Sequence, residues 1–502
     1  MTLGRNLLAG LANSIWSALI GLAVVPYYLK YLGIEAYGLI GFFVTTQALL
    51  SLLDMGMAPT INREVARCSA SGNLQQAGKL LHTLAVVYWG MAGLIALLIL
   101  VVAPLIAEYW LQSKQLSPQT ISHAVMLMGV VVACRWPIGL YQGALIGAHR
   151  LTVSSAINMA MVTAGSLGAV LVLAFVSPTI EAFFIWQACV GLVYAITIRY
   201  ATWRIIGKLN QKRFDIDKLK SVWHFTAGMS AIGLTGLVFT QMDKVVLSKM
   251  LGLDEFGHYM LATVVASGLS VLIAPVYPVV YPRFSALVAL GDTEKLKELY
   301  RLGTRMLAAV IFPIAIVLAV FAKDLVYVWT GNLSMASSVA PVISLLVLGS
   351  ALNGVMYFPY ALQLAFGKTW IPLTINILLM CLLVPLIVYL AQTYGALGCA
   401  MASLISQMVY VMFGPWLTHR YIIKGLWPKW LFQDVGIPMV ISIFVGLLGH
   451  YAIQAGSYSS YEKIFWATGL AIVTSILVVL TSRQLRVVAW NYAKLNMRVF
   501  KA

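Results

Sequence analysis

Charged residues are scarce in this sequence. Aspartate, glutamate, lysine and arginine together make up 10% of its 502 residues, whereas soluble domains carry about 25%. Hydrophobic residues make up 61%. A soluble fold cannot bury this much apolar surface, so the composition excludes a soluble protein and predicts an all-α polytopic membrane protein.

Acidic residues are the scarcer of the two charged types. There are 16 of them against 33 lysines and arginines, which gives a net charge of +17. A nucleic-acid-binding protein gathers its basic residues on one face or groove. Here they lie in short segments between long apolar runs, as membrane topology requires. The positive charge therefore indicates no nucleic-acid partner.

The sequence also lacks the spacings of metal-binding and catalytic chemistry. Its five cysteines form no CxxC pair and no Cys/His cluster, which argues against a zinc site or a disulfide framework. It has no Walker motif and no Ser/His/Asp arrangement near an aqueous face. The longest predicted outer loop, residues 323–338, has sixteen residues, which is too few for a folded domain. We therefore expect no enzyme activity, no metal and no cofactor, and a membrane-embedded enzyme of polysaccharide biosynthesis is kept as a second alternative.

Long apolar runs are what the sequence does contain, and about 20 apolar residues span a bilayer. Fourteen runs predict transmembrane helices: Leu7–Leu29, Tyr37–Met57, Leu81–Ile106, Ile121–Ile146, Val153–Val176, Ile180–Ile198, Phe225–Leu247, Phe256–Val280, Met306–Ala322, Val339–Leu364, Ile371–Ala391, Ala396–Trp416, Val435–Tyr451 and Ile464–Leu480.

The lysines and arginines between the runs predict the orientation. With the N-terminus inside, 26 of them lie in inner segments and five in outer segments. Cytoplasmic segments of membrane proteins carry this excess. We therefore expect a multi-pass protein of the bacterial inner membrane with both termini in the cytoplasm.

The chain repeats itself at an offset of 219 residues. Lys30–Gly38 aligns with Lys249–Gly257, and matching leucine, serine, proline and glycine residues continue the alignment without a gap over about sixty residues. An offset of six helices gives both copies the same orientation, so the repeat is parallel, about an axis along the membrane normal. It predicts two six-helix lobes and a C-terminal helix pair.

This organisation divides the chain into five parts. They are an N-lobe (1–200), a cytoplasmic basic loop (201–222), a C-lobe (223–417), helices thirteen and fourteen (418–482) and a cytoplasmic basic tail (483–502).

Several motifs carry a family resemblance. The turn Lys30–Gly38, then Leu53–Gly56 and Arg63, resembles the start of polysaccharide transporters of the O-antigen flippase type, as does Gln241–Gly252 leading into Gly257–Tyr259. These transporters belong to the multidrug/oligosaccharidyl-lipid/polysaccharide exporter superfamily, which includes the lipid II flippases.

The resemblance implies a two-lobed, alternating-access carrier. It would flip an undecaprenyl-pyrophosphate-linked oligosaccharide from the cytoplasmic to the periplasmic leaflet. Many flippases of this type have twelve helices. Fourteen is closer to the lipid II branch, in which the final helix pair shapes a groove for the lipid tail. The partners we expect are this substrate, membrane lipid, and a polymerase with other polysaccharide-assembly proteins.

Ionisable residues inside a bilayer are functional candidates because they are costly there. Arg135 lies near the middle of its predicted helix, where its guanidinium could bind a pyrophosphate with two parallel hydrogen bonds. A salt bridge to Asp54 or Asp243 is the structural alternative. Asp54, Asp243 and Lys244 are candidates for gating or for coupling to H⁺ or Na⁺, and neighbours such as Asp243 and Lys244 do not share a helical face, so they are not expected to neutralise each other.

Uncharged polar residues complete the predicted binding site. Asn13 lies on a polar stripe of the first helix, and Asn353 and Tyr357 lie on a stripe of the tenth. Such stripes suit a wet cavity that binds sugar hydroxyls, and suit hydrogen bonds between helices as well. Arg63 could capture pyrophosphate at the inner leaflet, or anchor the topology like any inner arginine.

One alternative comes from the same superfamily. A multidrug antiporter coupled to an ion would favour acidic residues in its cavity, whereas Arg135 favours an anion.

Overall fold

The computed structural model describes residues 2–54, 56–70, 74–207, 235–482 and 484–487. The described chain is helical throughout apart from short connections, and it divides into two compact units, Met1–Gly257 and His258–Ala502. Most of the predicted basic loop, the start of predicted helix seven and most of the basic tail lie outside the described residues. The lobe limits expected from the sequence stay a prediction.

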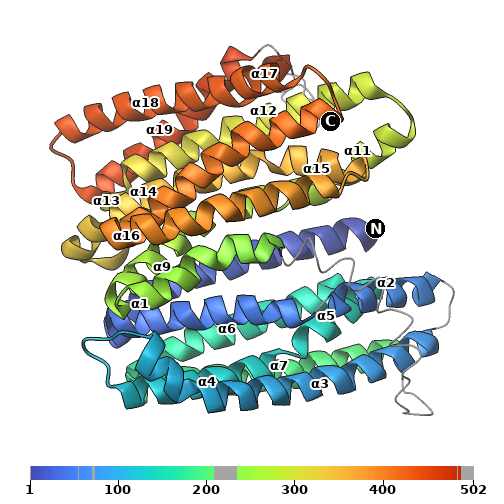
Figure 1. Cartoon of the computed structure of the whole chain (residues 1–502), viewed down its shortest axis with the longest axis vertical. Coiled ribbons are helices and arrows are strands. Elements are labelled where there is room, and N and C mark those ends of the chain that lie inside the picture. The colour runs from blue at the N-terminus through green and yellow to red at the C-terminus, as the bar shows by residue number, and fades with distance from the viewer. Residues whose placement is uncertain (1, 55, 71–73, 208–234, 483, 488–502) are drawn as a thin grey trace, which may run out of the picture. The chain divides into compact units, whose positions relative to one another are not determined.

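The first unit is a bundle of long helices (Figure 1). α1 packs against α6, α3 against α4, α2 against α5, and α7 against both α4 and α6. Their bounds are α1 (Thr2–Leu50), η1 (Ser51–Asp54), α2 (Met57–Ala70), α3 (Leu74–Leu105), η2 (Ile106–Trp110), α4 (Pro118–Arg135), α5 (Ile138–Gly147), α6 (Leu151–Phe175) and α7 (Ile180–Ile206). A further helix covers residues 235–250. It is followed by α9 (Leu253–Ser267), and the first unit ends within α9, at Gly257.

The second unit is built in the same way. α14 packs against α12 and α16, and α18 and α19 pack against each other and against α12. The elements are α10 (Ser270–Ile273), α11 (Val276–Ala289), α12 (Thr293–Val320), α13 (Ala322–Thr330), α14 (Leu333–Val355), α15 (Tyr357–Ala365), α16 (Trp370–Tyr421), α17 (Trp427–Lys429), η3 (Trp430–Gly436), α18 (Ile437–Ala455) and α19 (Ser460–Thr481).

Eleven helical segments of the described chain are long and apolar enough to cross a membrane. Two of them are too long for one crossing: α1 has 49 residues and α16 has 52, or about 75 Å each at 1.5 Å per residue. Each contains a glycine with non-helical backbone, Gly33 and Gly395. The sequence predicts a short connection between two helices at both places. The predicted total of fourteen stays a prediction.

The 219-residue repeat recurs in the positions of the helices. α2 begins at Met57 and α11 at Val276. α5 begins at Ile138 and α15 at Tyr357, and α6 begins at Leu151 and α16 at Trp370. Each pair lies 219 positions apart, so the repeat extends well beyond the sixty residues in which the sequence displays it.

Three predicted helices are interrupted. Ile121–Ile146 breaks at Trp136 and Pro137, Val339–Leu364 breaks at Met356, and Phe256–Val280 is divided among α9, α10 and α11. Pro137, Pro275 and Pro359 lie at three of these breaks, and a proline has no N–H to bond the carbonyl four residues earlier. The break between α9 and α10 has no proline. Breaks inside membrane helices leave backbone groups free and commonly mark binding sites.

The first unit contains a close contact that reflects the repeat. A Cβ added at Gly38 would lie 2.5 Å from the carbonyl oxygen of Leu253, and one added at Gly257 would lie 2.5 Å from that of Ile34. These four residues form two pairs 219 positions apart. The start of α9 and the part of α1 after Gly33 therefore approach closely through two equivalent glycines, as small residues allow between membrane helices.

The acidic residue of each copy of the repeat binds the loop between η2 and α4. Glu35 is 3% exposed and accepts hydrogen bonds from the Ser113 hydroxyl at 2.5 Å and from three backbone N–H groups of residues 114–116. Its equivalent, Asp254, accepts a hydrogen bond from Lys114 Nζ at 2.9 Å. That bond raises the pKa of Lys114, so the lysine stays charged.

Candidate functional site

Arg135 is the last residue of α4, immediately before the break at Pro137. Its Nη2 donates to Oε1 of Gln187 at 2.5 Å, and its guanidinium lies 5.7 Å from the centre of the Phe43 ring. Gly191 makes room for it, because a Cβ there would lie 3.2 Å from Cγ of Arg135.

Within the described part of the chain Arg135 forms no ion pair with a carboxylate. The alternative that Arg135 forms a salt bridge to Asp54 or Asp243 is therefore wrong for this structure. The physical reason is that both acids are already engaged, Asp54 by Tyr88 and Asp243 by Lys244.

Gln187 fixes the direction in which Arg135 points. It is 7% exposed, and its Nε2 donates to the backbone carbonyl of Gly165 at 3.2 Å. Its oxygen is thereby turned towards the guanidinium. Because an amide carries no charge, this contact orients the arginine without neutralising it.

A chain of polar side chains crosses the first unit and includes the predicted residue Asn13. Gln142 donates to the Tyr194 hydroxyl at 2.7 Å, which donates to Asn158 at 2.9 Å, and Asn158 donates to Asn13 at 2.7 Å. The chain joins α5, α7, α6 and α1. Sequence reasoning missed Gln142, Asn158, Gln187 and Tyr194, although each is a polar residue inside an apolar run, and that signal could have found them.

Asp54 is the last residue of η1, three residues before α2 begins at Met57. It accepts a hydrogen bond from the backbone N–H of Ala58 at 3.3 Å and another from the Tyr88 hydroxyl. These contacts give it a local structural task at a helix N-terminus, where a carboxylate is favourable. Its role in gating or ion coupling stays a prediction.

Asp243 and Lys244 form an ion pair with an N–O distance of 3.2 Å, and each side chain is 13% exposed. The expectation that sequence neighbours cannot neutralise each other is wrong here. The lysine side chain is long enough to fold back, and its ammonium also donates to the carbonyl of Thr240 at 2.9 Å.

Arg63 is exposed on α2, one turn before Arg67, which pairs with Glu64 at 2.7 Å. In the second unit, Asn353 donates to Oε1 of Gln407 at 3.2 Å. Tyr357 follows it by one turn, across the break at Met356. The binding roles of Arg63, Asn353 and Tyr357 stay predictions.

A buried ion cluster joins the C-terminal helices to α12. Asp434 in η3 is fully buried. It accepts hydrogen bonds from Arg301 at 2.8 Å and from Arg305, and Arg305 also donates to Gln484 at 2.9 Å. Sequence analysis placed both arginines among the topology anchors, because nothing local shows that they share an acid more than a hundred residues away.

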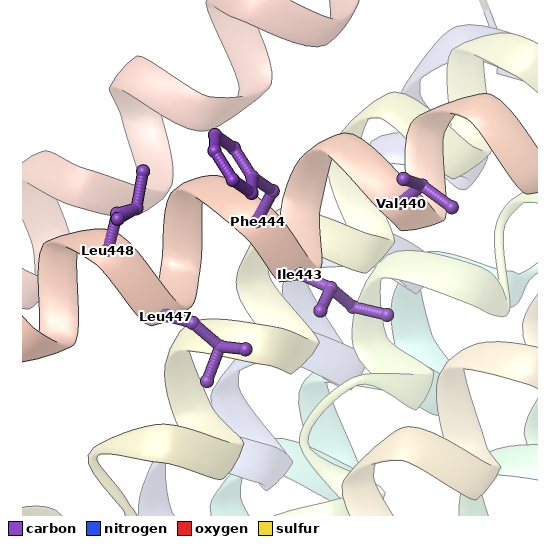
Figure 2. Close-up of a pocket in the computed structure, with 5 residues that line it drawn as sticks. All are labelled: Val440, Ile443, Phe444, Leu447 and Leu448. Atoms are coloured by element: carbon purple, nitrogen blue, oxygen red, sulfur yellow. The ribbon is translucent and has the colours of Figure 1, made fainter.

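An apolar groove of about 450 Å³ runs along α18. It is lined by Val440, Ile443, Phe444, Leu447 and Leu448, and Figure 2 shows their side chains extending from the helix. All five residues lie on one face of α18, at the i, i+3, i+4, i+7 and i+8 positions of a helix.

Comparisons with known proteins agree with this arrangement. The family described as polysaccharide biosynthesis protein matches residues 30–336, which is more than half of the chain. The "Putative O-antigen transporter" of Shigella flexneri is 21% identical over 421 residues, covering 81% of this chain and 97% of that protein. The lipopolysaccharide biosynthesis protein WzxC of Escherichia coli is 26% identical over 223 residues, covering 43% of this chain and 44% of that protein.

Solved structures of the superfamily share the fold. The lipid II flippase MurJ, in an inward closed conformation, superposes with a TM-score of 0.66 at 14% identity, covering 94% of this chain and 98% of that one. An inward-facing multidrug transporter of the MATE family superposes with a TM-score of 0.63 at 12% identity, covering 88% of this chain and 96% of that one. The chain is therefore a member of the polysaccharide biosynthesis protein family and has the flippase fold of the multidrug/oligosaccharidyl-lipid/polysaccharide exporter superfamily.

Proposed function

We propose that this protein flips an undecaprenyl-pyrophosphate-linked oligosaccharide from the cytoplasmic to the periplasmic leaflet of the bacterial inner membrane, for the synthesis of O-antigen, capsule or exopolysaccharide. The observation that carries the proposal is Arg135: a cation within a membrane helix, bonded to a neutral amide and paired with no described carboxylate.

Arg135 is the group that meets the pyrophosphate. A charge in the bilayer is costly unless a partner offsets it, and an anionic ligand is such a partner. Within the described protein Nη2 makes one hydrogen bond, to Gln187. Because Nη2 carries two N–H groups, its second N–H can form a fork with the N–H of Nε or of Nη1, which donates two parallel hydrogen bonds to phosphate oxygens. A cationic drug would meet repulsion at the same place.

The remaining features suit the other parts of such a substrate. The Gln142–Tyr194–Asn158–Asn13 chain, together with Asn353 and Tyr357, offers polar groups to sugar hydroxyls. The groove on α18 suits the isoprenoid tail. Arg63 is the first basic contact at the inner leaflet.

The membrane potential supplies a driving force for export. With the inside negative, each negative charge moved outward gains about 2.3 kcal/mol per 100 mV. The empty carrier must then return to its inward-facing state together with its own charges. Binding of H⁺ or Na⁺ at Asp54 or Asp243 would couple this return step to the movement of the ion. In the proposed orientation both termini, the basic loop (201–222) and the tail (483–502) lie on the cytoplasmic side. The flipped substrate would then reach a polymerase and other assembly proteins from the periplasmic leaflet.

Deletion of the gene tests the proposal. Cells without the protein should accumulate the undecaprenyl-linked saccharide on the cytoplasmic leaflet and lose surface polymer, measured by lipid extraction and polymer staining. Absence of the precursor itself would indicate the membrane enzyme. Normal polymer with raised sensitivity to cationic drugs would indicate the multidrug antiporter, which the shared MATE fold keeps as an alternative.

A further inference from the structure

Five tyrosines gather in the second unit on three elements: Tyr277 and Tyr281 on α11, Tyr357 and Tyr360 on α15, and Tyr410 on α16. We propose that this tyrosine cluster is the platform on which the sugar rings of the substrate stack. The inference rests on the proposed function and adds the part of the substrate that these residues recognise.

The rings are close and ordered. Tyr277 and Tyr281 lie one turn apart on α11, with ring centres 5.4 Å apart and planes inclined by 8°. Tyr277 also meets Tyr360 at 5.7 Å with an inclination of 36°. Tyr410 lies on α16, which packs against α15, the helix of Tyr357 and Tyr360. The cluster thus presents aromatic faces from neighbouring helices.

The hydroxyl groups of the cluster are unused by the protein. Among the described residues, none of the five side chains makes a hydrogen bond, and none of their oxygens is among the enclosed atoms without a partner. Other tyrosines of this chain bond within it: Tyr28 to Ser166, and Tyr194 to Asn158. Because an unpaired hydroxyl is costly in hydrocarbon, the five hydroxyls meet water or a ligand.

The cluster is neutral, which selects the class of ligand. Its polar neighbours are the amides of Asn353 and Gln407, bonded to each other one turn from Tyr357 and Tyr410. A pyrophosphate needs a cation such as Arg135, and an isoprenoid tail makes no use of hydroxyls. Aromatic faces with uncharged donors and acceptors match a sugar, which has apolar C–H faces and many hydroxyls.

The first repeat copy shows that the fold itself does not require these tyrosines. The positions 219 residues earlier hold Ala58, Asn62, Ile138, Tyr141 and Gly191. The same offset places Gly354 at the position equivalent to Arg135. Tyr360 has a tyrosine counterpart, Tyr141, whereas the other four tyrosines are particular to the second copy and the cation Arg135 is particular to the first.

Binding by the purified protein in lipid nanodiscs tests the proposal. The probes are the lipid-linked saccharide that accumulates in cells lacking the protein, and undecaprenyl pyrophosphate without sugar. Replacing Tyr277 and Tyr360 together by leucine should weaken binding of the first probe about 10-fold, since the sugar loses two aromatic faces, and should leave binding of the second unchanged. Tyr389→Leu, at a tyrosine that is 68% exposed, is the matched control.

Tyr277→Phe keeps the ring and removes the hydroxyl, so it shows a partial loss for the saccharide probe even where the leucine variant folds poorly. An equal loss for both probes, or no loss for either, would overturn the proposal and leave the proposed function intact. Loss of binding of a lipophilic cation in place of the saccharide would assign the cluster to a cationic ligand. Wild-type protein that binds neither probe would overturn both.

Discussion

The stability lost on removing Arg135 depends on which residues the side chain contacts. A buried arginine that pairs with an acid is a structural element, and its removal strands a charge, at a cost of about 3–5 kcal/mol. Arg135 instead meets the oxygen of Gln187, whose amide is held by the carbonyl of Gly165. Its removal leaves one neutral oxygen without a partner, which is a smaller loss.

This difference makes the role of Arg135 testable. Arg135→Ala should keep the abundance of the protein and reduce transport about 10- to 100-fold, the equivalent of one charged hydrogen-bonding group. Arg135→Lys should recover only part of the activity because lysine lacks the planar fork. Flipping of the lipid-linked saccharide in proteoliposomes is the measurement, and the exposed Arg150→Ala is the control.

Arg135→Met separates charge from packing, since methionine fills similar space without charge. Transport that survives this change would show that the cation is not needed and would remove the basis of the pyrophosphate site.

Among the elements, the contact between α1 and α9 depends on two glycines. Gly38 faces the backbone carbonyl of Leu253, and Gly257 faces that of Ile34. Ile34 and Leu253 are 219 positions apart, as Gly38 and Gly257 are. A rigid backbone cannot give way as a flexible side chain can, so any Cβ at these positions pushes the helices apart.

We expect Gly38→Ala and Gly257→Ala to destabilise the protein by similar amounts, about 1–3 kcal/mol each. The melting temperature of the protein in nanodiscs measures the effect. Gly93→Ala is the control, because nothing lies within 4 Å of a Cβ at Gly93 and alanine favours a helix by about 1 kcal/mol. Unequal effects at the two glycines would contradict the equivalence of the two contacts.

The orientation of the whole molecule in the membrane can be tested at two exposed residues. Gln115 lies in a predicted outer loop and Glu298 in a predicted inner segment, and both are exposed. In a variant without native cysteines, Gln115→Cys should react with an impermeant reagent added outside intact cells. Glu298→Cys should react only with a permeant reagent.

Gln115 is preferable to Ser113 for this purpose because the Ser113 hydroxyl bonds to Glu35. Labelling of Glu298→Cys from outside would reverse the predicted orientation, and with it the direction of transport.

The sequence by itself determined the membrane class, the apolar runs, the bias of basic residues and the offset of the repeat. These features follow from composition and local order, since a bilayer requires apolar helices and internally paired backbone whatever the tertiary contacts are. The family followed as well, because Lys30–Gly38 and its copy at Lys249–Gly257 are continuous motifs.

Only the tertiary structure decided which side chains meet. It joined Arg135 to Gln187, Glu35 to the loop after Gln112, and Asp434 to two arginines of α12. It also gathered tyrosines from α11, α15 and α16. Such contacts join helices distant in the chain, and helical periodicity tells which face a residue occupies but not which helix lies against that face.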